Sequence, residues 1–331
     1  MSESSRSSAV VVESFRPDDP GVGARLASVE LHRPEPGWIP VTVEAASLNH
    51  HDVWSCRGVG LRESQLPMVL GTDATGTLED GTPVIVHGVV TSPTWRGDET
   101  LDPTRSLLSE RYPGTLAERV WVPEGNVVAR PAGLSAHEAA CLPTAYLTAY
   151  RLLFTAAGLR PGQSVLVQGA GGGVATACIL LARAAGLRVL VTSRSESRAE
   201  RARELGAHVV VESGARLPHL VDAVIETVGK ATWSHSLRSL VPGGVVAVAG
   251  ATTGPDADAD LNRVFFKGLR VVGSTMGTRV ELERLVSLLV ATGVRPLVDR
   301  VVPLDGVPGS DGALAALAAG EVIGKVVVDV A

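Results

Sequence analysis

The segment most indicative of a binding site is a run of glycines at the end of a short apolar segment. The segment Val165-Leu-Val-Gln168 breaks into Gly-Ala-Gly-Gly-Gly-Val at 169–174 and restarts as an alanine-rich, helix-like stretch over 177–185. A glycine turn between a strand and a helix offers backbone N–H groups to a pyrophosphate, because the helix dipole is positive at that end. The turn is not a strict G-x-G-x-x-G, because valine stands at the last glycine position. The residues predicted to bind a dinucleotide here are Gly169, Ala170, Gly171, Gly172, Gly173 and Val174.

The segments after the turn favour this interpretation over a glycine turn without a ligand. A second apolar run at 188–193 precedes a charge-rich helical stretch over 196–205. Further short apolar strands recur at helix-length intervals, at 208–211, 221–229, 244–250 and 269–273. This alternation predicts an α/β fold with a doubly wound parallel sheet of the Rossmann type, buried on both faces.

The end of the second strand of such a sheet separates NAD from NADP. An acidic residue there bonds to the ribose 2′-hydroxyl, whereas a cation accommodates a 2′-phosphate. This chain has no carboxylate at the strand tip, and instead offers the Ser193 hydroxyl and the Arg194 and Arg198 guanidiniums. We therefore predict NADP(H) as the cofactor. In the alternative, Arg194 and Arg198 are solvated charges at a helix start and Glu196 reaches back to the ribose.

The first part of the chain, 10–139, has a different pattern. Strand-like runs at 38–44, 83–87 and 117–123 are short and are separated by Gly and Pro, which predicts an all-β or barrel-like domain. The long polar segment 89–113 is expected to be mainly loop.

A helix start marks the passage between the two patterns. Ser135 is the expected N-cap, and Glu138 three residues later completes a capping box. We therefore assign the Rossmann domain to 140–285. The other domain is expected to span 1–139 and to be completed by 286–331.

The composition excludes several classes of protein. The 331 residues carry a formal net charge of −5 at pH 7, which argues against nucleic acid as a partner. No apolar run reaches the length of a membrane span, and the serine-rich start lacks the apolar core of a secretory signal. Cys56, Cys141 and Cys178 are far apart and odd in number, which predicts idle or buried thiols in a reducing compartment. We expect a cytoplasmic protein without a nucleic-acid or membrane partner.

Several segments, taken in order, form a combination that is more specific than any one of them. They are the glycine turn, Ala46-Ser-Leu-Asn-His-His-Asp52, Leu70-Gly-Thr-Asp-Ala-Thr-Gly76, Gly114-Thr-Leu-Ala-Glu-Arg-Val120, Leu147-Thr-Ala-Tyr150 and Gly324-Lys325. The chain thereby resembles the medium-chain dehydrogenase/reductase superfamily, and most closely its zinc-free, quinone-oxidoreductase-like branch. The resemblance implies a GroES-like β-barrel catalytic domain beside the Rossmann domain, with the active site in the cleft between them. It also implies a homodimer, since relatives commonly pair an edge of the Rossmann sheet across a two-fold axis.

The resemblance identifies the positions at which relatives hold a catalytic zinc. In the zinc alcohol dehydrogenases of the superfamily, the three ligand positions correspond to Asn49, Thr72 and Thr144. An amide and two hydroxyls supply neither the thiolate nor the imidazole that Zn²⁺ prefers. The adjacent His50 and His51 are expected to point in different directions and not to replace the missing ligands. The long polar segment also lacks the cysteines of a structural zinc site, so we expect no metal.

Catalytic residues are expected mainly near the first of these positions. The resemblance places Asn49 near the nicotinamide carboxamide, although its side chain could instead bond to its own backbone and stabilise a turn. His50, His51 and Tyr146 are the candidate proton donors, each with a structural role as the alternative. Asp52 is expected to fix the local turn or a neighbouring histidine rather than to act as a base.

Other residues are expected at the cofactor because of the resemblance or because of their place in the sheet. A loop that follows a buried strand lies at the carboxyl end of the sheet, where dinucleotides bind. The additional residues expected at the cofactor are Thr148, Gly250, Ala251, Thr252, Met276 and Lys325.

Without a metal, the chemistry shifts toward an acceptor that is already electrophilic. Loss of zinc removes the Lewis acid, and hydride delivery to a quinone or an activated C=C needs mainly orientation and a dry pocket. Trp54 and Trp95 could form flat walls for a conjugated or aromatic substrate, or could pack as ordinary core residues. Gly60 stands where some enoyl reductases of the superfamily carry a tyrosine, which weakens the case for an enoyl thioester. The sequence therefore predicts an NADPH-dependent, zinc-independent reductase of a quinone or an α,β-unsaturated carbonyl.

Two other functions stay open at this point. One is an alcohol or aldehyde dehydrogenase that keeps the fold and replaces the metal with a histidine relay. The other is a non-catalytic NADPH-binding protein, because no single proton donor stands out in the sequence.

Overall fold

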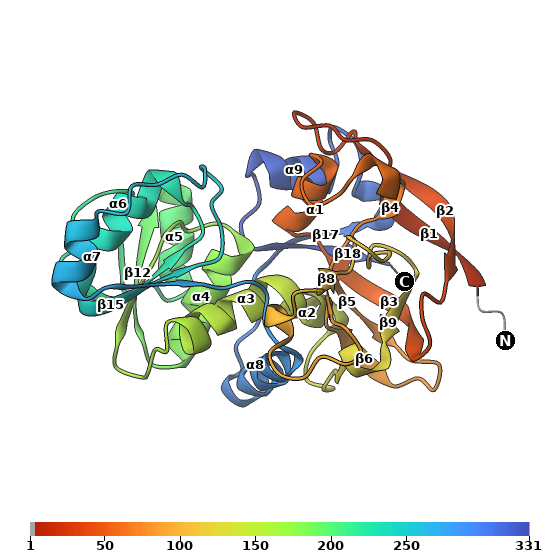
Figure 1. Cartoon of the computed structure of the whole chain (residues 1–331), viewed down its shortest axis with the longest axis horizontal. Coiled ribbons are helices and arrows are strands. Elements are labelled where there is room, and N and C mark those ends of the chain that lie inside the picture. The colour runs from red at the N-terminus through yellow and green to blue at the C-terminus, as the bar shows by residue number, and fades with distance from the viewer. Residues whose placement is uncertain (1–3, 331) are drawn as a thin grey trace. The chain divides into compact units, whose positions relative to one another are not determined.

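The computed structural model describes residues 4–330, which fold into two compact units (Figure 1). The first unit comprises the chain up to residue 145 together with 278–291 and the segment from 295 onward. The second unit comprises 146–277 together with 292–294. The short segments 140–145 and 278–285 therefore belong to the first unit, whereas the sequence assigned them to the Rossmann domain.

The second unit is built on a six-stranded sheet in which every neighbouring pair of strands is parallel. Its order is β13-β12-β11-β14-β15-β16, which is the Rossmann order, so the predicted fold class is confirmed for this unit. The strands are β11 (Ser164–Val167), β12 (Arg188–Ser193), β13 (Val209–Glu212), β14 (Val221–Glu226), β15 (Leu240–Val248) and β16 (Arg270–Gly273).

The central strands of this sheet are buried because their residues are apolar on both faces. In β11 and β12 the valines and leucines are fully buried, as expected for a parallel sheet that is covered by helices. The helices that connect the strands pack against them (Figure 1). These helices are α4 (Gly173–Ala184), α5 (Glu196–Glu204), α6 (Lys230–Arg238) and α7 (Leu261–Lys267). Helix α3 (Leu147–Tyr150) precedes the sheet in the chain and packs on α4.

The first unit is mainly β-structure, as predicted for a GroES-like domain. Its largest sheet runs β10-β6-β5-β3-β18-β17, with β9 also paired to β3, and a second sheet runs β2-β1-β4. The strands are β1 (Ser4–Val12), β2 (Ala24–His32), β3 (Trp38–Ser47), β4 (Met68–Val69), β5 (Asp73–Thr77), β6 (Pro83–Val86), β7 (Val89–Val90), β8 (Ser106–Leu107), β9 (Arg119–Pro123), β10 (Val127–Ala129), β17 (Val298–Pro303) and β18 (Lys325–Asp329).

The helices of the first unit explain where its boundary falls. They are α1 (His50–Cys56), α2 (Ala136–Ala140), α8 (Arg279–Thr292) and α9 (Ala313–Ala319). Ser135 caps α2 in the predicted capping box with Glu138. Helix α2 packs on β3, β5 and β18, and the Ala140 carbonyl accepts a hydrogen bond from the Ser47 hydroxyl at 2.9 Å. The backbone N–H of Arg279 bonds to the Glu99 carboxylate at 3.4 Å, so the start of α8 also belongs to this unit.

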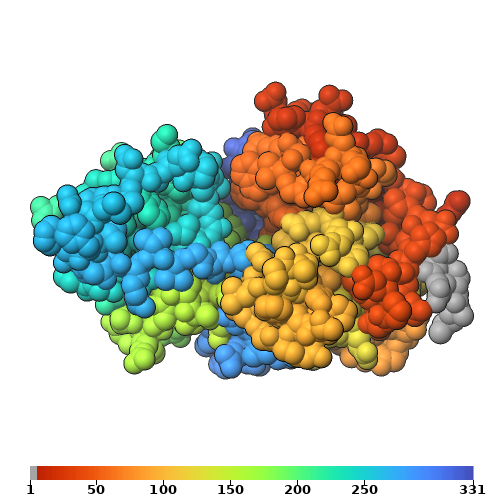
Figure 2. Space-filling model, in the orientation of Figure 1, coloured from red at the N-terminus to blue at the C-terminus, as the bar shows by residue number. Residues whose placement is uncertain are grey.

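Two segments have irregular local structure. The segment 89–113 is largely irregular, but β7 and β8 pair within it, and Figure 2 shows it, in amber, spread over the surface of the first unit. The chain over 142–156 is not one regular helix, because π-helical windings flank α3 on both sides. No helix among the described residues is long and apolar enough to cross a membrane.

Candidate active site and cofactor site

The glycine turn of the second unit has the features of a phosphate cradle. Gly169 has φ +85°, and Gly172 is the N-cap of the twelve-residue helix α4 without any side chain that caps the helix. The first backbone N–H groups of α4 therefore stay available to an anion. The Thr176 hydroxyl donates to the Gly172 and Gly173 carbonyls at 3.2 and 3.1 Å, so it does not occupy the free N–H groups. These features fit a dinucleotide pyrophosphate, whose binding at this turn stays a prediction.

Arg198 lies directly against this turn. A Cβ added at Gly171 would lie 3.0 Å from the Arg198 Cδ and Nε, so a larger residue there would require the Arg198 side chain to shift. Arg198 belongs to the first turn of α5, which follows β12. The structure thus brings one of the two predicted guanidiniums to the predicted phosphate-binding loop.

The residues around the tip of β12 bear on the alternative in which Glu196 binds the ribose of NAD. Ser193 is nearly buried, and its hydroxyl donates to the Ser195 carbonyl at 2.8 Å. Arg194 is exposed beside it. The Glu196 carboxylate accepts a hydrogen bond from Arg203 at 2.8 Å, about two turns further along the same face of α5. In this arrangement Glu196 is already engaged with a cation on its own helix.

The loop after β15 is held against the loop after β14. The N–H of Thr252 bonds to the Thr227 carbonyl at 3.4 Å. A Cβ at Gly229, where φ is +88°, would lie 2.8 Å from the Cα of Ala251. The predicted cofactor residues Gly250, Ala251 and Thr252 therefore stand at the carboxyl end of the sheet, and their shape depends on the neighbouring loop.

Two further predicted cofactor residues of the second unit are buried. Thr148 in α3 is 7% exposed, and Met276 is equally buried, with a left-handed backbone at φ +49°. Their contact with a cofactor stays a prediction.

The first unit contains a buried polar cluster around Lys325 and Asp73, which are 2% and 0% exposed. The Lys325 ammonium donates to the Asn49 Oδ1 at 2.6 Å, to the Leu48 carbonyl at 2.7 Å and to the Asp73 Oδ2 at 3.2 Å. The Asn49 amide in turn donates to the Asp73 Oδ2 at 2.9 Å, and the Ser47 hydroxyl does so at 2.7 Å. All three ammonium hydrogens of Lys325 thus have acceptors inside this unit. A role for Lys325 or Asn49 at the cofactor stays a prediction.

The three positions that correspond to zinc ligands in relatives do meet in the structure. The Asn49 amide lies 3.3 Å from the Thr72 hydroxyl, and the Thr72 and Thr144 hydroxyls lie 2.9 Å apart. Their chemistry does not fit Zn²⁺, because an amide and two hydroxyls are poor ligands and the Lys325 ammonium contacts the same amide. Within residues 4–330, no group of three His, Cys, Asp or Glu side chains is arranged to hold a metal.

His51 is paired with a carboxylate that the sequence did not single out. Its Nε2 lies 3.3 Å from the Glu110 Oε1, and Glu110 also accepts from the Leu107 N–H at 2.9 Å. Burial by itself lowers the pKa of His51, but the hydrogen bond to Glu110 and the carboxylates of Asp52 and Asp73 outweigh it, so the pKa is raised. Asp52 fixes the local turn as expected, because it accepts from the Asn49 N–H at 2.8 Å.

The other two predicted proton donors have different surroundings. His50 is exposed, and its pKa is lowered by nearby protein atoms that partly desolvate the ring and by the charges of Lys325 and Arg57. The Tyr146 side chain is fully buried. Of the three candidates, His51 has both partial access to solvent, at 20% of its side chain, and a raised pKa.

The two tryptophans have structural partners, and the three thiols are buried. Arg57 lies over the Trp54 ring at 5.3 Å from its centre, and the Trp95 indole N–H donates to the Asp98 carbonyl at 2.9 Å. The cysteines are unpaired and buried, as predicted. Burial raises the pKa of Cys56 and of Cys141 to about 12, so neither is a thiolate near neutral pH.

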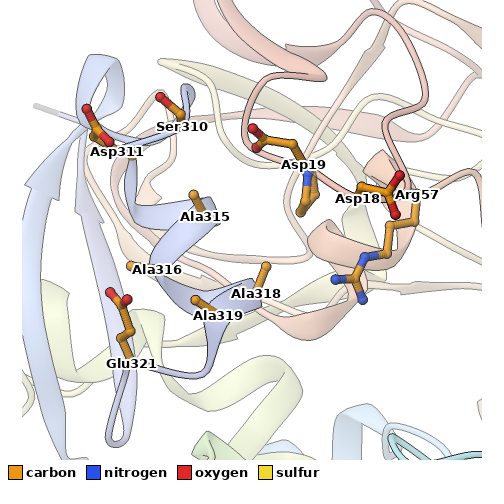
Figure 3. A pocket seen from close by; sticks show the side chains of 12 residues that line it. Asp18, Asp19, Arg57, Ser310, Asp311, Ala315, Ala316, Ala318, Ala319 and Glu321 are labelled. Atoms are coloured by element: carbon orange, nitrogen blue, oxygen red, sulfur yellow. The ribbon is translucent and has the colours of Figure 1, made fainter.

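A pocket of about 510 Å³ opens elsewhere on the first unit (Figure 3). Alanines of α9 form one wall, and Asp19 and Arg57 approach from the other side (Figure 3). None of the predicted site residues lines this pocket, so it is separate from the candidate active site and cofactor site.

Sequence reasoning missed Asp73, Glu110, Gln168 and Glu226. Asp73 lies inside a segment that carried the resemblance, and a buried strand position occupied by a carboxylate was the available signal. Glu110 had no signal, because it lies in a segment that reads as polar loop.

Two family models match the chain in the two units. The model "Alcohol dehydrogenase GroES-like domain" matches residues 35–132, and the model "Zinc-binding dehydrogenase" matches residues 173–291. Three relatives match over most of their length. The zinc-type alcohol dehydrogenase-like protein YogA of Leptosphaeria maculans is 30% identical, over 92% of this chain and 94% of the relative. The acryloyl-coenzyme A reductase of Sulfurisphaera tokodaii is 27% identical over 87% and 92%, and the quinone oxidoreductase of Mus musculus is 29% identical over 82% and 83%.

A solved structure described as an NAD-dependent alcohol dehydrogenase superposes with a TM-score of 0.88 at 30% identity, covering 98% of this chain and 100% of that one. The fold and these matches define an oxidoreductase with a GroES-like domain and a Rossmann-like domain. The chain belongs to the medium-chain dehydrogenase/reductase superfamily.

Proposed function

We propose that the protein is an NADPH-dependent reductase that works without zinc and reduces a quinone or an α,β-unsaturated carbonyl. The observation that carries the proposal is the contact between the Lys325 ammonium and Asn49 at 2.6 Å, in the cluster that replaces the metal ligands of relatives. A fixed ammonium in contact with a ligand position would repel a divalent cation. The names of the relatives, which include a quinone oxidoreductase and an acryloyl-coenzyme A reductase, support the same acceptor classes.

The proposed chemistry asks little of the protein beyond orientation and a proton. Bound NADPH supplies the hydride. A conjugated acceptor is already electrophilic, so no Lewis acid is needed to polarise it. The uncapped N-terminus of α4 and the Arg198 guanidinium beside Gly171 would hold the phosphates.

We assign the proton to His51. Its pKa is raised even though burial opposes protonation, because Glu110 accepts a hydrogen bond from the ring and two further carboxylates lie nearby. A histidine with a raised pKa keeps its proton to higher pH than a free imidazole, and it can donate that proton to the reduced substrate. Glu110 acts as the partner that orients the ring and holds the charge.

We assign the preference for NADPH to Arg194 and Arg198. Two observations support this assignment: Arg194 is exposed at the tip of β12, and Arg198 of α5 lies against Gly171. A 2′-phosphate is recognised at the end of the second strand in this fold. Glu196, the residue of the NAD alternative, is paired with Arg203.

One observation favours a second activity, the oxidation of an alcohol or the reduction of an aldehyde. The pair of His51 and Glu110 at 3.3 Å is also what a metal-free proton relay from an alcohol would need. Alcohol dehydrogenases are among the solved structures of similar fold. A preference for saturated alcohols over enones would select this activity.

We also propose a homodimer formed through the edge of the second unit's sheet. Strand β16 is the last strand of the sheet, and its Val271 is 49% exposed. On the preceding helix α7, Phe265 and Phe266 are 61% and 81% exposed. Covering such an apolar edge by a second copy removes unpaired backbone groups and apolar surface from water. Light scattering should give twice the chain mass, and Phe266→Glu should return the monomer mass.

A cytoplasmic location completes the proposal. Three buried, unpaired thiols suit a reducing compartment.

The test of the central proposal is oxidation of NADPH and of NADH by protein that has been exhaustively stripped of metal by chelation. The acceptors are a benzoquinone, a naphthoquinone, an enone, an enoyl thioester and a simple aldehyde. We expect turnover of a quinone or the enone with NADPH preferred, and no change when zinc is added back. Activity that appears only with zinc would overturn the metal-free assignment, and equal use of both cofactors would overturn the role of Arg194 and Arg198.

A further inference from the structure

A chain of buried polar side chains runs under the carboxyl ends of three strands of the second unit. Gln168 follows β11 and is 1% exposed, Thr192 lies near the end of β12 and is 1% exposed, and Glu226 ends β14 and is 0% exposed. Such positions are normally apolar in a parallel sheet, and burial of polar groups is costly unless they are fully bonded. The presence of several such groups in contact therefore indicates a function other than ordinary packing.

The hydrogen bonds of this chain have one consistent direction. The Gly169 N–H donates to the Thr192 hydroxyl at 3.0 Å, and that hydroxyl donates to the Gln168 Oε1 at 2.8 Å. The Gln168 amide donates to the Ser236 hydroxyl at 2.9 Å, which donates to the Glu226 carboxylate at 2.6 Å. Each hydroxyl is donor and acceptor at once, and hydrogen bonds aligned in this way strengthen one another.

His235 fixes the orientation of the Gln168 amide. The amide nitrogen lies 2.9 Å from the His235 Nδ1, and the His235 Nε2 lies 2.8 Å from the Ala215 carbonyl. A carbonyl accepts only, so Nε2 carries the hydrogen and Nδ1 accepts from Gln168. This leaves the Gln168 oxygen facing Thr192.

At its Glu226 end, the chain of hydrogen bonds holds the 227–229 loop. The Glu226 Oε1 accepts from the backbone N–H groups of Val228 at 2.8 Å and Gly229 at 3.0 Å. That loop binds the loop after β15, because the N–H of Thr253 donates to the Val228 carbonyl at 2.8 Å. The network thus links the glycine turn, the tip of β12 and the 250–254 loop, which are three of the segments assigned to the cofactor in this unit.

We propose that Gln168 and Glu226 are positioning residues for the dinucleotide. The chain of hydrogen bonds between them holds the glycine turn and the 227–229 loop in one fixed arrangement. The inference rests on the proposed cofactor site and deepens it. The two residues do not touch the cofactor; they act through Gly169 at one end and through Val228 and Gly229 at the other.

The test compares Glu226→Gln, Thr192→Val and the double variant with the unmodified protein, using NADPH and 2′,5′-ADP as probes. A glutamine at 226 presents an NH₂ group to donors and loses an acceptor, so we expect NADPH binding to weaken about tenfold or more. The loss for 2′,5′-ADP, which lacks the nicotinamide half, should be smaller. The matched control is Glu204→Gln, an exposed glutamate on α5 that is paired with Arg201, and it should leave both affinities unchanged.

The double variant tests whether the chain acts as a unit. If it does, the combined loss in NADPH affinity should be clearly smaller than the sum of the single losses, because either change already breaks the same chain. Amide hydrogen exchange gives a second readout: Thr192→Val should raise exchange at 227–229 as well as at Gly169.

The outcomes separate this inference from the function on which it rests. If the unmodified protein binds neither NADPH nor NADH, the proposed cofactor site is wrong and the inference falls with it. If the unmodified protein binds NADPH but Glu226→Gln binds it equally well, or lowers the melting temperature while both probes weaken by the same factor, only the positioning role is overturned. Additive losses and exchange confined to the mutated end would overturn the coupling.

Discussion

Each unit contains a completely buried carboxylate inside a polar cluster, Asp73 in the first and Glu226 in the second, and the two are stabilised in different ways. Asp73 in the first unit has an ammonium partner, Lys325, at 3.2 Å. Its Oδ1 is nevertheless buried without a hydrogen-bond partner among the described residues. Glu226 in the second unit uses both of its oxygens, and its four donors are uncharged: two backbone N–H groups and the Thr232 and Ser236 hydroxyls.

The difference shows which kind of contact holds each site together. The partners of Glu226 lie within ten residues of it in sequence, so local folding of β14 and α6 assembles them. Lys325 is 252 residues from Asp73, so that pair exists only when the barrel is complete. A buried charge pair is also far more sensitive to loss of one partner than a neutral hydrogen bond, because an uncompensated charge remains.

The largest effect is therefore expected for Lys325→Met. It should lower the free energy of unfolding by about 3–5 kcal/mol, because Asp73 is left as an unpaired buried charge. The measurement is denaturant unfolding, and the double variant with Asp73→Asn should recover part of the loss. The matched control is Lys267→Met in the second unit, whose ammonium donates only to the Leu240 carbonyl at 2.8 Å and should cost about 1 kcal/mol. Equal losses for the two lysines would show that the Asp73 pair is not special.

The next effect concerns the proton donor of the first unit. His51→Gln should lower kcat by about 100-fold with the proposed acceptors, since it removes a general acid. The measurement is steady-state kinetics with NADPH saturating, and His32→Gln, an exposed histidine on β2, is the control. An unchanged kcat would mean that the proton comes from solvent or from another group.

A somewhat smaller effect is expected in the second unit, where the cations lie at the surface of the cofactor site. Arg194→Ala should weaken NADPH binding about tenfold and leave NADH binding unchanged, because only the 2′-phosphate loses a charged hydrogen bond. The measurement is the dissociation constant of each cofactor. Arg188→Ala, at the opposite end of the same strand, should change neither. Equal weakening for both cofactors would contradict the assignment of Arg194 to the 2′-phosphate.

The smallest effect is a shift in the pH dependence of activity. It tests whether carboxylates of the first unit raise the pKa of His51. Because the pKa of His51 is raised, the protonated ring persists to higher pH, and activity should fall as pH rises through that raised pKa. Glu110→Gln removes a carboxylate that holds the proton, so this falling limb should move to lower pH. The exposed Glu124→Gln should leave the pH profile in place, and an unmoved limb in Glu110→Gln would separate the profile from His51.

The same linkage predicts a matching change in stability. A histidine whose pKa is raised on folding stabilises the fold fully below its unfolded pKa, and this contribution is lost as pH rises through the folded pKa. Glu110→Gln should therefore reduce stability more at mildly acidic pH than at alkaline pH.

Local sequence was a good guide wherever structure depends on neighbouring residues. The glycine turn, the strand of continuous valines before it and the Ser135 capping box are set by backbone freedom, apolar runs and a side chain three residues from its partner. The Rossmann order follows from repeated strand and helix segments with right-handed connections. The boundary between the units was less predictable, because contacts of α2 with β3, β5 and β18 decide it.

By itself, the sequence determined the class of fold, the glycine turn between β11 and α4 and the absence of ordinary zinc ligands at Asn49, Thr72 and Thr144, because each depends on residue type at short spacing. Tertiary structure alone decided that Lys325 meets Asp73 and that His51 meets Glu110 from a segment that reads as featureless loop. It also decided that Gln168, which follows β11, shares a hydrogen-bonded chain with Glu226 at the end of β14. Burial and partnership of a charged side chain depend on which distant segments fold against it, and no local pattern records that choice.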